Sequence, residues 1–233
     1  MLVDGVALDA SEAPLPPLPS VFAPHRLDAG GDALAEAVRR APLEGAGTLA
    51  WTDGALDGAA AVVLEPERPL GPARLAWLAA ANALADALAA LAPPELPVRW
   101  RWPATLTVNG GVVGALRLAV PEGVAEDAVP DWLAIGYTIR LRWPAGTITG
   151  EHPDETALAD EGFEELTAAE LAAGWARHLM ANLDEWEARG VRRVSDKFLA
   201  RLEGGEGARR GIDPATGALV LERDGARETV PLA

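Results

Sequence analysis

Residues 101–116 read RWPATLTVNGGVVGAL, and the β pattern around them indicates the class of fold. Two β-rich runs, 105–108 and 112–120, flank the dipeptide Asn109-Gly110. Two-residue hairpin turns favour Asn-Gly, because both of these residues accept a positive φ. Directly upstream, residues 98–102 alternate apolar and charged side chains with the period of a strand. The sequence therefore predicts a strand followed by a hairpin.

Further strand-like runs lie on both sides of this hairpin. Residues 131–143 read DWLAIGYTIRLRW and are expected to form one long strand or a strand pair. Since alternate residues of a strand share a face, one face would carry Leu133, Ile135, Tyr137, Ile139, Leu141 and Trp143. Residues 47–51 and 59–64 are shorter runs, joined by an expected turn of Asp and Gly.

Three segments have apolar residues at helical spacing. They are the run from Asp32 to Pro42, residues 71–92 and the run from Thr167 to Gly190. Asp32 is a good N-cap, and Thr167 with Glu170 has the spacing of a capping box. Pro42 and Gly190 are expected to end their helices, because proline lacks an N–H and glycine suits a helix C-terminus. His178 borders the apolar stripe of the last helix and is interpreted as a packing residue or a surface hydrogen-bond partner, and not as a catalyst.

The domain organisation is predicted from the two ends of the chain. Residues 1–20 form a proline-rich N-terminal arm, which favours an extended path. Residues 195–233 contain three short strand runs, 209–212, 218–222 and 228–232, and are expected to form a small β domain. Residues 21–194 lie between them as the main domain. The fold class is α+β.

Composition excludes several classes of function. The chain has 233 residues, of which 20 are Lys or Arg and 35 are Asp or Glu, giving a formal charge of −15. Such a charge disfavours nucleic acid and anionic lipid as partners. Cysteine is absent and the three histidines are far apart, so no metal site is expected. With no membrane-length apolar run and no signal-peptide pattern, we expect a cytoplasmic protein.

The hairpin sequence resembles the signature of the biotin/lipoate protein ligase family. That signature is K-W-P-N-D, a strand, a glycine turn and K-[LI]-A-G-[IL]. Residues 131–141 lie where the family has its next strand, and the tail GIDPATGALVLERDG (residues 211–225) resembles the family's C-terminal domain. The resemblance implies a mixed or antiparallel sheet flanked by helices, with a small C-terminal β-barrel-like domain. It also implies that active members join a carboxylic acid vitamin to AMP and pass it to a carrier-protein lysine. ATP with Mg²⁺ and biotin or lipoate are therefore expected as cofactors only if this chain is active.

The chain departs from the signature where the chemistry needs cations. The lysine that follows the glycine turn corresponds to Val112, or to Gly111 if the register shifts by one residue. The family's arginine- and glycine-rich loop falls between Trp51 and Ala59, where this chain has two aspartates and no basic residue. The octanoyltransferase branch uses a cysteine, which is absent. Arg117 is the one cation close to the expected pocket and is the candidate catalytic residue.

The resemblance leaves three hypotheses for function. The first is a binding fold that has lost adenylating chemistry. The second is an active ligase or acyltransferase that uses Arg117 in place of the lysine, and the third is a non-enzymatic protein-interaction module. The candidate ligand-binding residues are Trp51, Trp102, Pro103, Gly111, Val112, Gly114 and Arg117. The partners considered are a small carboxylic acid or nucleotide, a carrier protein and a second copy in a homodimer.

Overall fold

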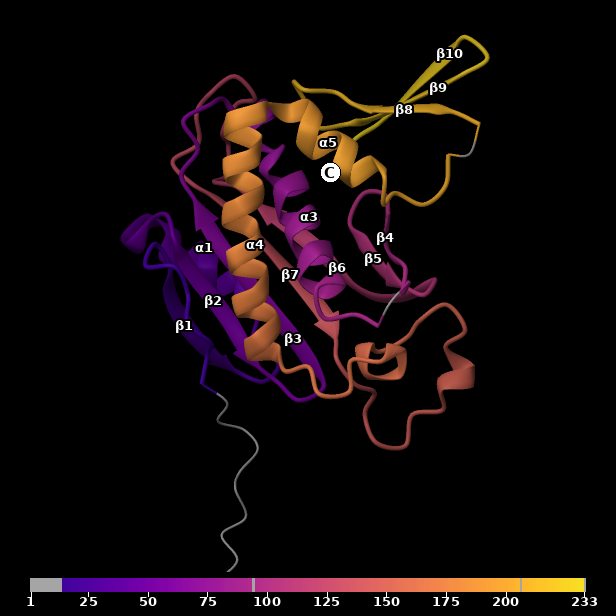
Figure 1. The fold of residues 1–233 in the computed structure, drawn as a ribbon. Coiled ribbons are helices and arrows are strands. Elements are labelled where there is room, and N and C mark those ends of the chain that lie inside the picture. Colours follow the sequence, from indigo (N-terminus) through magenta and orange to yellow (C-terminus); the bar gives the residue numbers. More distant parts are fainter. Residues whose placement is uncertain (1–13, 94, 206, 233) are drawn as a thin grey trace, which may run out of the picture.

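A seven-stranded mixed sheet forms the centre of the protein (Figure 1). The computed structural model describes residues 14–93, 95–205 and 207–232, so the first part of the predicted arm lies outside the described residues. The strands, in spatial order, are β1 (Ala23–Asp28), β2 (Thr48–Asp53), β3 (Asp57–Leu64), β7 (Leu133–Arg140), β6 (Gly111–Ala119), β5 (Thr105–Val108) and β4 (Val98–Arg101). β1 runs parallel to β2, and every other neighbouring pair is antiparallel.

Helices cover both faces of this sheet. The helices are α1 (Ala33–Glu44), α2 (Leu70–Ala73), α3 (Ala76–Ala89), α4 (Ala168–Arg189) and α5 (Val191–Leu199), with 3₁₀ turns at Thr149–Glu151 and Leu158–Glu161. α3 and α4 lie together on one face, where they bury the larger apolar cluster (Figure 1). α1 covers the opposite face with a smaller cluster of alanines and Val63. No helix in the described part of the chain has the length and apolar character needed to cross a bilayer.

The predicted hairpin is confirmed. β5 and β6 pair through a turn in which Asn109 has φ 52° and Gly110 has φ 86°. Positive φ at both central residues is the geometry that Asn-Gly favours. Of the two alternatives for residues 131–143, the structure has one strand, β7, with Ile135 and Ile139 buried beneath the helices. Trp143 lies beyond the end of β7 and its indole N–H donates to Asp160, so its predicted place on the strand face was wrong.

Two local predictions differ from the structure, and one strand was not predicted. Pro42 lies inside α1, which continues to Glu44 and ends at Gly45 with φ 70°. The predicted helix over residues 71–92 is two helices, α2 and α3, separated by a turn at Arg74 and Leu75. β1 was not predicted, because its sequence APHRLD has no alternation of apolar and polar residues.

The C-terminal strands form a separate three-stranded antiparallel sheet. It consists of β8 (Arg209–Ile212), β9 (Leu219–Arg223) and β10 (Ala226–Val230), and the described residues do not close it into a barrel. Gly190 does end α4, but α5 begins at the next residue and packs against α3. The proposed boundary between residues 194 and 195 therefore falls within α5.

Candidate functional site

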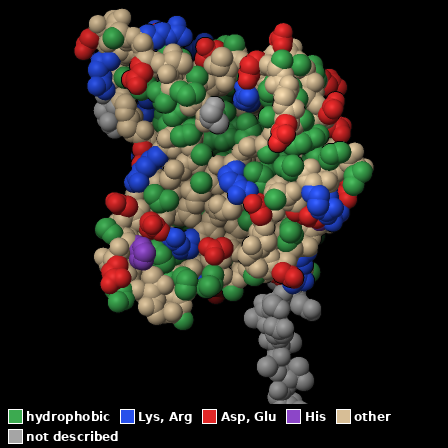
Figure 2. Space-filling model, turned by 180° about the vertical axis from the view of Figure 1, so that it is seen from behind, with side chains coloured by type: hydrophobic (Ala, Val, Ile, Leu, Met, Phe, Trp, Pro, Cys, Tyr) green, Lys and Arg blue, Asp and Glu red, His purple; other side chains and the backbone are tan. Residues whose placement is uncertain are grey.

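Small residues leave a hollow on the α1 side of the sheet. Ala59, Thr138 and Ala115 face one another across β3, β7 and β6, and the neighbouring row pairs Ala61 with Gly136. Seen from this side, the surface between the coloured side chains is hollowed and mostly backbone or uncharged polar atoms (Figure 2). A cavity of about 350 Å³ lies here. Its lining residues are Gly30, Gly31, Thr52, Asp57, Gly58, Ala59, Val112, Val113, Gly114, Thr138, Ile139, Arg140 and Glu155.

The N-terminus of α1 forms one rim of this cavity. Asp32 caps the helix by accepting hydrogen bonds from the backbone N–H groups of Leu34 and Ala35. The same carboxylate accepts a hydrogen bond of 2.6 Å from Arg117 on β6. The Arg117 hydrogen bond is the main reason that the pKa of Asp32 lies below its usual value. Arg117 therefore lies beside the cavity, and its guanidinium is paired with Asp32 at the cavity rim.

The charges that line the cavity are mainly negative. Asp57 and Glu155 contribute carboxylates, and Arg140 contributes the single guanidinium among the described lining residues. Arg140 is opposite Asp57 in the β3–β7 register and makes a 2.7 Å ion pair with Glu155. Its guanidinium also stacks 4.1 Å from the ring centre of Trp143. The one lining cation is therefore neutralised by the protein itself.

Residues 154–156 cover the start of β6. The backbone N–H of Val112 donates to the Asp154 carbonyl at 2.9 Å, and the Thr156 N–H donates to the Val112 carbonyl at 3.0 Å. A Cβ atom at Gly111 would lie 2.7 Å from Cγ2 of Thr156, which is closer than real contacts allow. A Cβ at Gly114 would lie 2.1 Å from the Thr138 carbonyl oxygen, so only glycine lets β6 approach β7 here. Both positions that the sequence predicted as counterparts of the family lysine, Gly111 and Val112, thus lie next to residues 154–156.

The structure places the predicted ligand-binding residues in three locations. Val112 and Gly114 line the cavity, and Gly111 and Arg117 are beside it. Trp51 is buried in the cluster beneath α3 and α4.

The Trp-Pro pair belongs to the region around the C-terminal sheet. The Trp102 indole N–H donates to the Pro231 carbonyl at 3.0 Å, and its ring meets Trp77 and Phe198 edge-on. The Trp102–Pro103 peptide bond is cis. Neither residue contributes to the lining of the α1-side cavity.

Sequence reasoning did not identify Thr138, Arg140 or Glu155 as site residues. The sequence did contain a signal for two of them, because Thr138 and Arg140 are polar positions in an otherwise apolar strand. Glu155 had none, since it is brought to β6 by an irregular segment far along the chain. Within the described ranges, no group of three or more His, Asp or Glu side chains is placed to hold a metal ion.

A mixed seven-stranded sheet between helical layers, followed by a small β sheet, is the architecture of biotin protein ligases. The chain belongs to the biotin/lipoate A/B protein ligase family, whose model matches residues 15–200. A comparison with curated proteins gives no match.

Solved structures agree with this assignment. A biotin protein ligase-like protein of unknown function from Silicibacter is 31% identical, with a TM-score of 0.79 over 93% of this chain and 96% of its own. The Aquifex aeolicus biotin protein ligase in complex with biotin and ATP is 15% identical, with a TM-score of 0.65 over 89% of this chain and 94% of its own. The Leishmania major biotin protein ligase in complex with biotinyl-5-AMP is 18% identical, with a TM-score of 0.53 over 89% and 98%.

Proposed function

We propose that this protein is a small-molecule-binding member of the biotin/lipoate ligase family in which acyl-adenylate formation has been lost. One observation carries the proposal. Residues 154–156 bond to Val112 and fill the side-chain space of Gly111. Val112, or Gly111 if the register shifts by one residue, is the predicted counterpart of the family lysine. The cavity beside these positions has no lysine among its described lining residues.

Electrostatics supports the same conclusion. Adenylation brings a carboxylate and a triphosphate together, and fixed cations or N–H donors must offset their repulsion. In this cavity the charges of Arg140 and Glu155 offset each other in an ion pair, and Asp57 leaves the lining with a net negative charge. Two like charges about 4 Å apart repel by roughly 4 kcal/mol near a protein surface. The lining would therefore oppose triphosphate binding.

Arg117 offers little as a substitute for the lysine. Its guanidinium is bound to Asp32, which also caps α1, so recruiting Arg117 to a substrate would break that contact. The loop between β2 and β3 contains no basic residue to assist it. Ligase activity that depends on Arg117 is the outcome that would favour the second hypothesis.

The first experiment measures chemistry. The purified protein is incubated with Mg²⁺-ATP and biotin, lipoate or octanoate, and pyrophosphate release and acyl-AMP are quantified. The Aquifex aeolicus ligase, whose structure holds biotin and ATP, is the positive control. We expect no product above background for this chain. Magnesium-dependent acyl-AMP formation would overturn the proposal, and its loss in Arg117→Ala would assign Arg117 to the reaction.

The second experiment measures binding. Thermal unfolding is followed with biotin, lipoate, biotinyl-AMP and ATP, since ligands of this kind occupy the related structures. A ligand at 100 times its dissociation constant adds about 2.7 kcal/mol to the free energy of unfolding. We expect stabilisation by at least one small carboxylic acid or adenylate. A flat response to every ligand would favour a protein-interaction module instead.

A further inference from the structure

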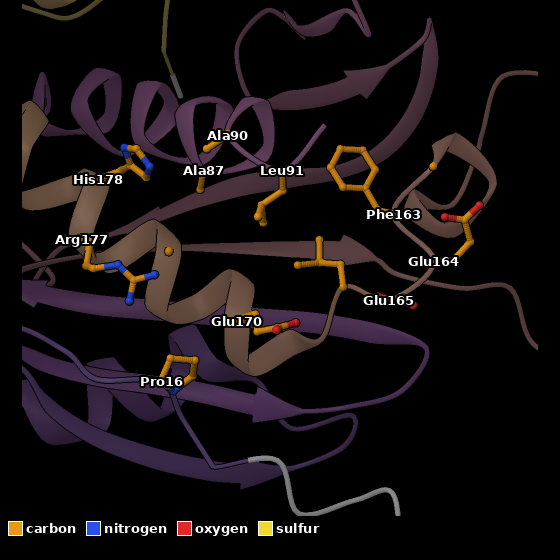
Figure 3. Close-up of a pocket in the computed structure, with 13 residues that line it drawn as sticks. Pro16, Ala87, Ala90, Leu91, Phe163, Glu164, Glu165, Glu170, Arg177 and His178 are labelled. Atoms are coloured by element: carbon orange, nitrogen blue, oxygen red, sulfur yellow. The ribbon is translucent and has the colours of Figure 1, made fainter. Parts of the chain in front are cut away.

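A second and larger cavity lies on the opposite face of the sheet from the candidate site. Its volume is about 850 Å³, and it is enclosed by the C-terminal end of α3, the N-terminal half of α4, the loop at residues 162–166 and the arm at Pro16 (Figure 3). Cavities of this size accommodate drug-sized ligands. The proposed function does not use this cavity.

Apolar side chains form one wall of this cavity. Ala87 comes from the last turn of α3 and Leu91 from the turn after it, and Phe163 and Leu166 come from the loop that precedes α4. Leu91 keeps 53% of its surface exposed although it lies in this wall. Gly174 on α4 provides the room, because it has no side chain and the nearest neighbour of an added Cβ would be Ala87 at 3.7 Å. An apolar group bound here would cover Leu91 and gain the usual benefit of burial.

Two opposite charges stand on α4 on either side of Gly174. Glu170 lies one turn before it and Arg177 lies about one turn after it. Seven residues of α-helix rise about 10 Å, and the structure forms no ion pair between the two side chains. Glu170 and Arg177 both line the cavity (Figure 3). The Glu170 carboxylate is turned back toward Thr167 at the start of α4, and the Arg177 guanidinium is turned toward Pro17. The cavity therefore has an anionic group near the start of α4 and a cationic group about two turns further along the helix.

Both charged groups have hydrogen-bonding atoms left over for a ligand. Arg177 donates one hydrogen bond, to the Pro17 carbonyl at 3.1 Å, and a guanidinium has five N–H donors. Glu170 uses Oε2 for the capping box with Thr167, which leaves Oε1 with no partner among the described residues. Glu164 and Glu165 add carboxylates to the lining.

We propose that this cavity binds a short apolar peptide with free termini, about three residues long. Its terminal carboxylate would pair with Arg177 and its terminal ammonium with Glu170, while a central apolar side chain would contact Leu91. Three extended residues span at most about 10 Å, which is comparable to the rise of the α4 backbone from residue 170 to residue 177. A fatty acid would leave the glutamates unpaired, and a simple amine would leave Arg177 unpaired. Charge complementarity at both ends therefore favours a zwitterion with an apolar middle.

The test is calorimetric titration of the full chain with the tripeptide Ala-Leu-Ala. The N-acetylated and C-amidated forms of the same peptide remove one terminal charge each. Three variants complete the set. Glu170→Gln keeps the capping box, which accepts Gln at this position, and removes the charge. Arg177→Gln removes the cation, and Gly174→Leu fills the cavity. Glu187→Gln, at an exposed position of α4, is the matched control.

We expect saturable binding of Ala-Leu-Ala to the natural chain and to Glu187→Gln. Blocking either terminus, or changing either Glu170 or Arg177, should weaken binding about tenfold or more, and Gly174→Leu should abolish it. Acetylating the peptide should weaken its binding to Glu170→Gln only slightly, since this variant already lacks the carboxylate that would pair with the peptide ammonium. Failure of the natural chain to bind, or equal binding of the free and blocked peptides, would overturn the proposal. Because the blocked peptides are tested on the natural chain, the result stands even if a variant fails to fold.

Discussion

Thr156 occupies the space into which a side chain at Gly111 would project. A Cβ at Gly111 would lie 2.7 Å from Cγ2 and 2.8 Å from Cβ of Thr156, and 3.3 Å from its backbone nitrogen. These atoms cannot swing aside, because the Thr156 N–H is bonded to Val112 and its hydroxyl is bonded to Glu161 at 2.8 Å. The segment that covers β6 and the glycine beneath it therefore depend on each other.

The first prediction concerns this contact. Gly111→Ala should lower the free energy of unfolding by about 1–3 kcal/mol, since overpacking forces neighbouring backbone to shift. Gly111→Lys should lower it at least as much, because its Cβ meets the same atoms. Gly211→Ala, in β8, is the control, since an added Cβ there meets no atom within 4 Å. Urea unfolding followed by tryptophan fluorescence measures all three. Equal stabilities of Gly111→Ala and Gly211→Ala would show that residues 154–156 do not hold the position found here.

The second prediction separates the two roles of Asp32. Asp32→Ala removes the cap of α1 and the ion pair with Arg117, and should cost about 1 kcal/mol or slightly more. Asp32→Asn keeps an oxygen for the cap and removes only the charge. Because a half-exposed ion pair contributes at most about 1 kcal/mol, this variant should lose much less. Chemical denaturation measures the free energy of unfolding of both variants and of Arg117→Ala, which removes the ion pair from the other side. A loss in Asp32→Asn as large as in Asp32→Ala would assign the stabilisation to the ion pair.

The sequence predicted most of the sheet but only part of the site. Asn109-Gly110 identifies the hairpin because the turn requirement is local, and β7 is identified by its alternation. α5 could not be inferred from Gly190, since a glycine that ends one helix can also begin the next. The site depends on contacts over long sequence separations, such as that of Thr156 with Gly111, which no local pattern records.

The charge of Arg117 shows the same limit. Its place on the strand after the glycine turn suggested that it faced the pocket, and it does lie on that side of the sheet. The sequence gives no sign that Asp32, 85 residues earlier, meets it. Pairing between distant charges depends on the register of the whole sheet and on the position of α1.

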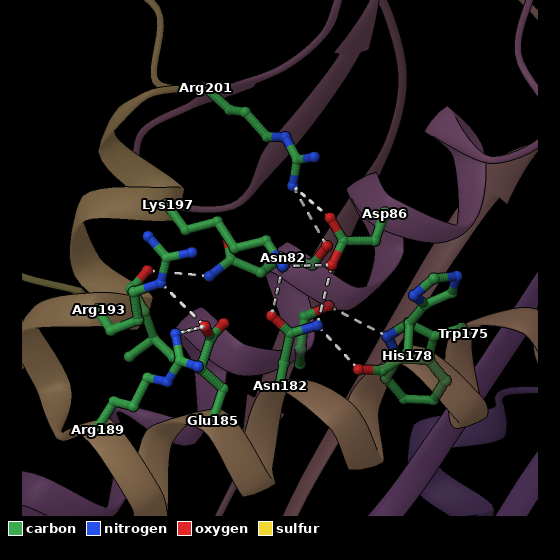
Figure 4. Close-up of polar contacts among 12 residues, drawn as sticks. Asn82, Asp86, Trp175, His178, Asn182, Glu185, Arg189, Arg193, Lys197 and Arg201 are labelled. Atoms are coloured by element: carbon green, nitrogen blue, oxygen red, sulfur yellow. Dashed lines mark hydrogen bonds and ion pairs between the residues drawn. The ribbon is translucent and has the colours of Figure 1, made fainter.

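A network around Asp86 joins three helices (Figure 4). Asp86 on α3 accepts hydrogen bonds from Lys197 at 2.6 Å, from Arg201 at 3.0 Å and from Asn182 on α4 at 3.0 Å. Burial by itself would raise the pKa of Asp86. The hydrogen bonds from Asn182 and Lys197 and the charges of Lys197 and Arg201 outweigh burial, so the pKa lies below its usual value. The single lysine of the chain is therefore part of the packing of α5.

The third prediction concerns this network and its pH dependence. Asp86→Asn should cost about 1.5–3 kcal/mol at pH 7, because hydrogen bonds to a charged group are lost and two cations remain. Asp184→Asn, at an exposed position of α4, is the control. Since the folded pKa is depressed, the stabilisation is fully present above the unfolded value near 4 and falls as the pH drops through the folded value. The stability difference between Asp86→Asn and the natural chain should shrink in that range. A difference that stays constant from pH 7 to pH 3 would contradict the assignment.

The fourth prediction tests where the C-terminal unit begins. Phe198 is fully buried, and its ring centre lies 5.2 Å from that of Trp77 and 6.2 Å from that of Trp100. These tryptophans belong to α3 and β4. Phe198→Ala should therefore destabilise the main body of the protein by about 3–5 kcal/mol.

The control is Arg192→Ala, because the side chain of Arg192 on the same helix is 92% exposed. Thermal unfolding should remain a single transition in both variants, shifted down strongly in Phe198→Ala and little in Arg192→Ala. In that case residues after α5, and not residues from 195 onward, form the appended unit. If Phe198→Ala instead melted a small C-terminal transition and left the main one unchanged, the boundary at residues 194 and 195 would stand, since Phe198 would then stabilise only the tail.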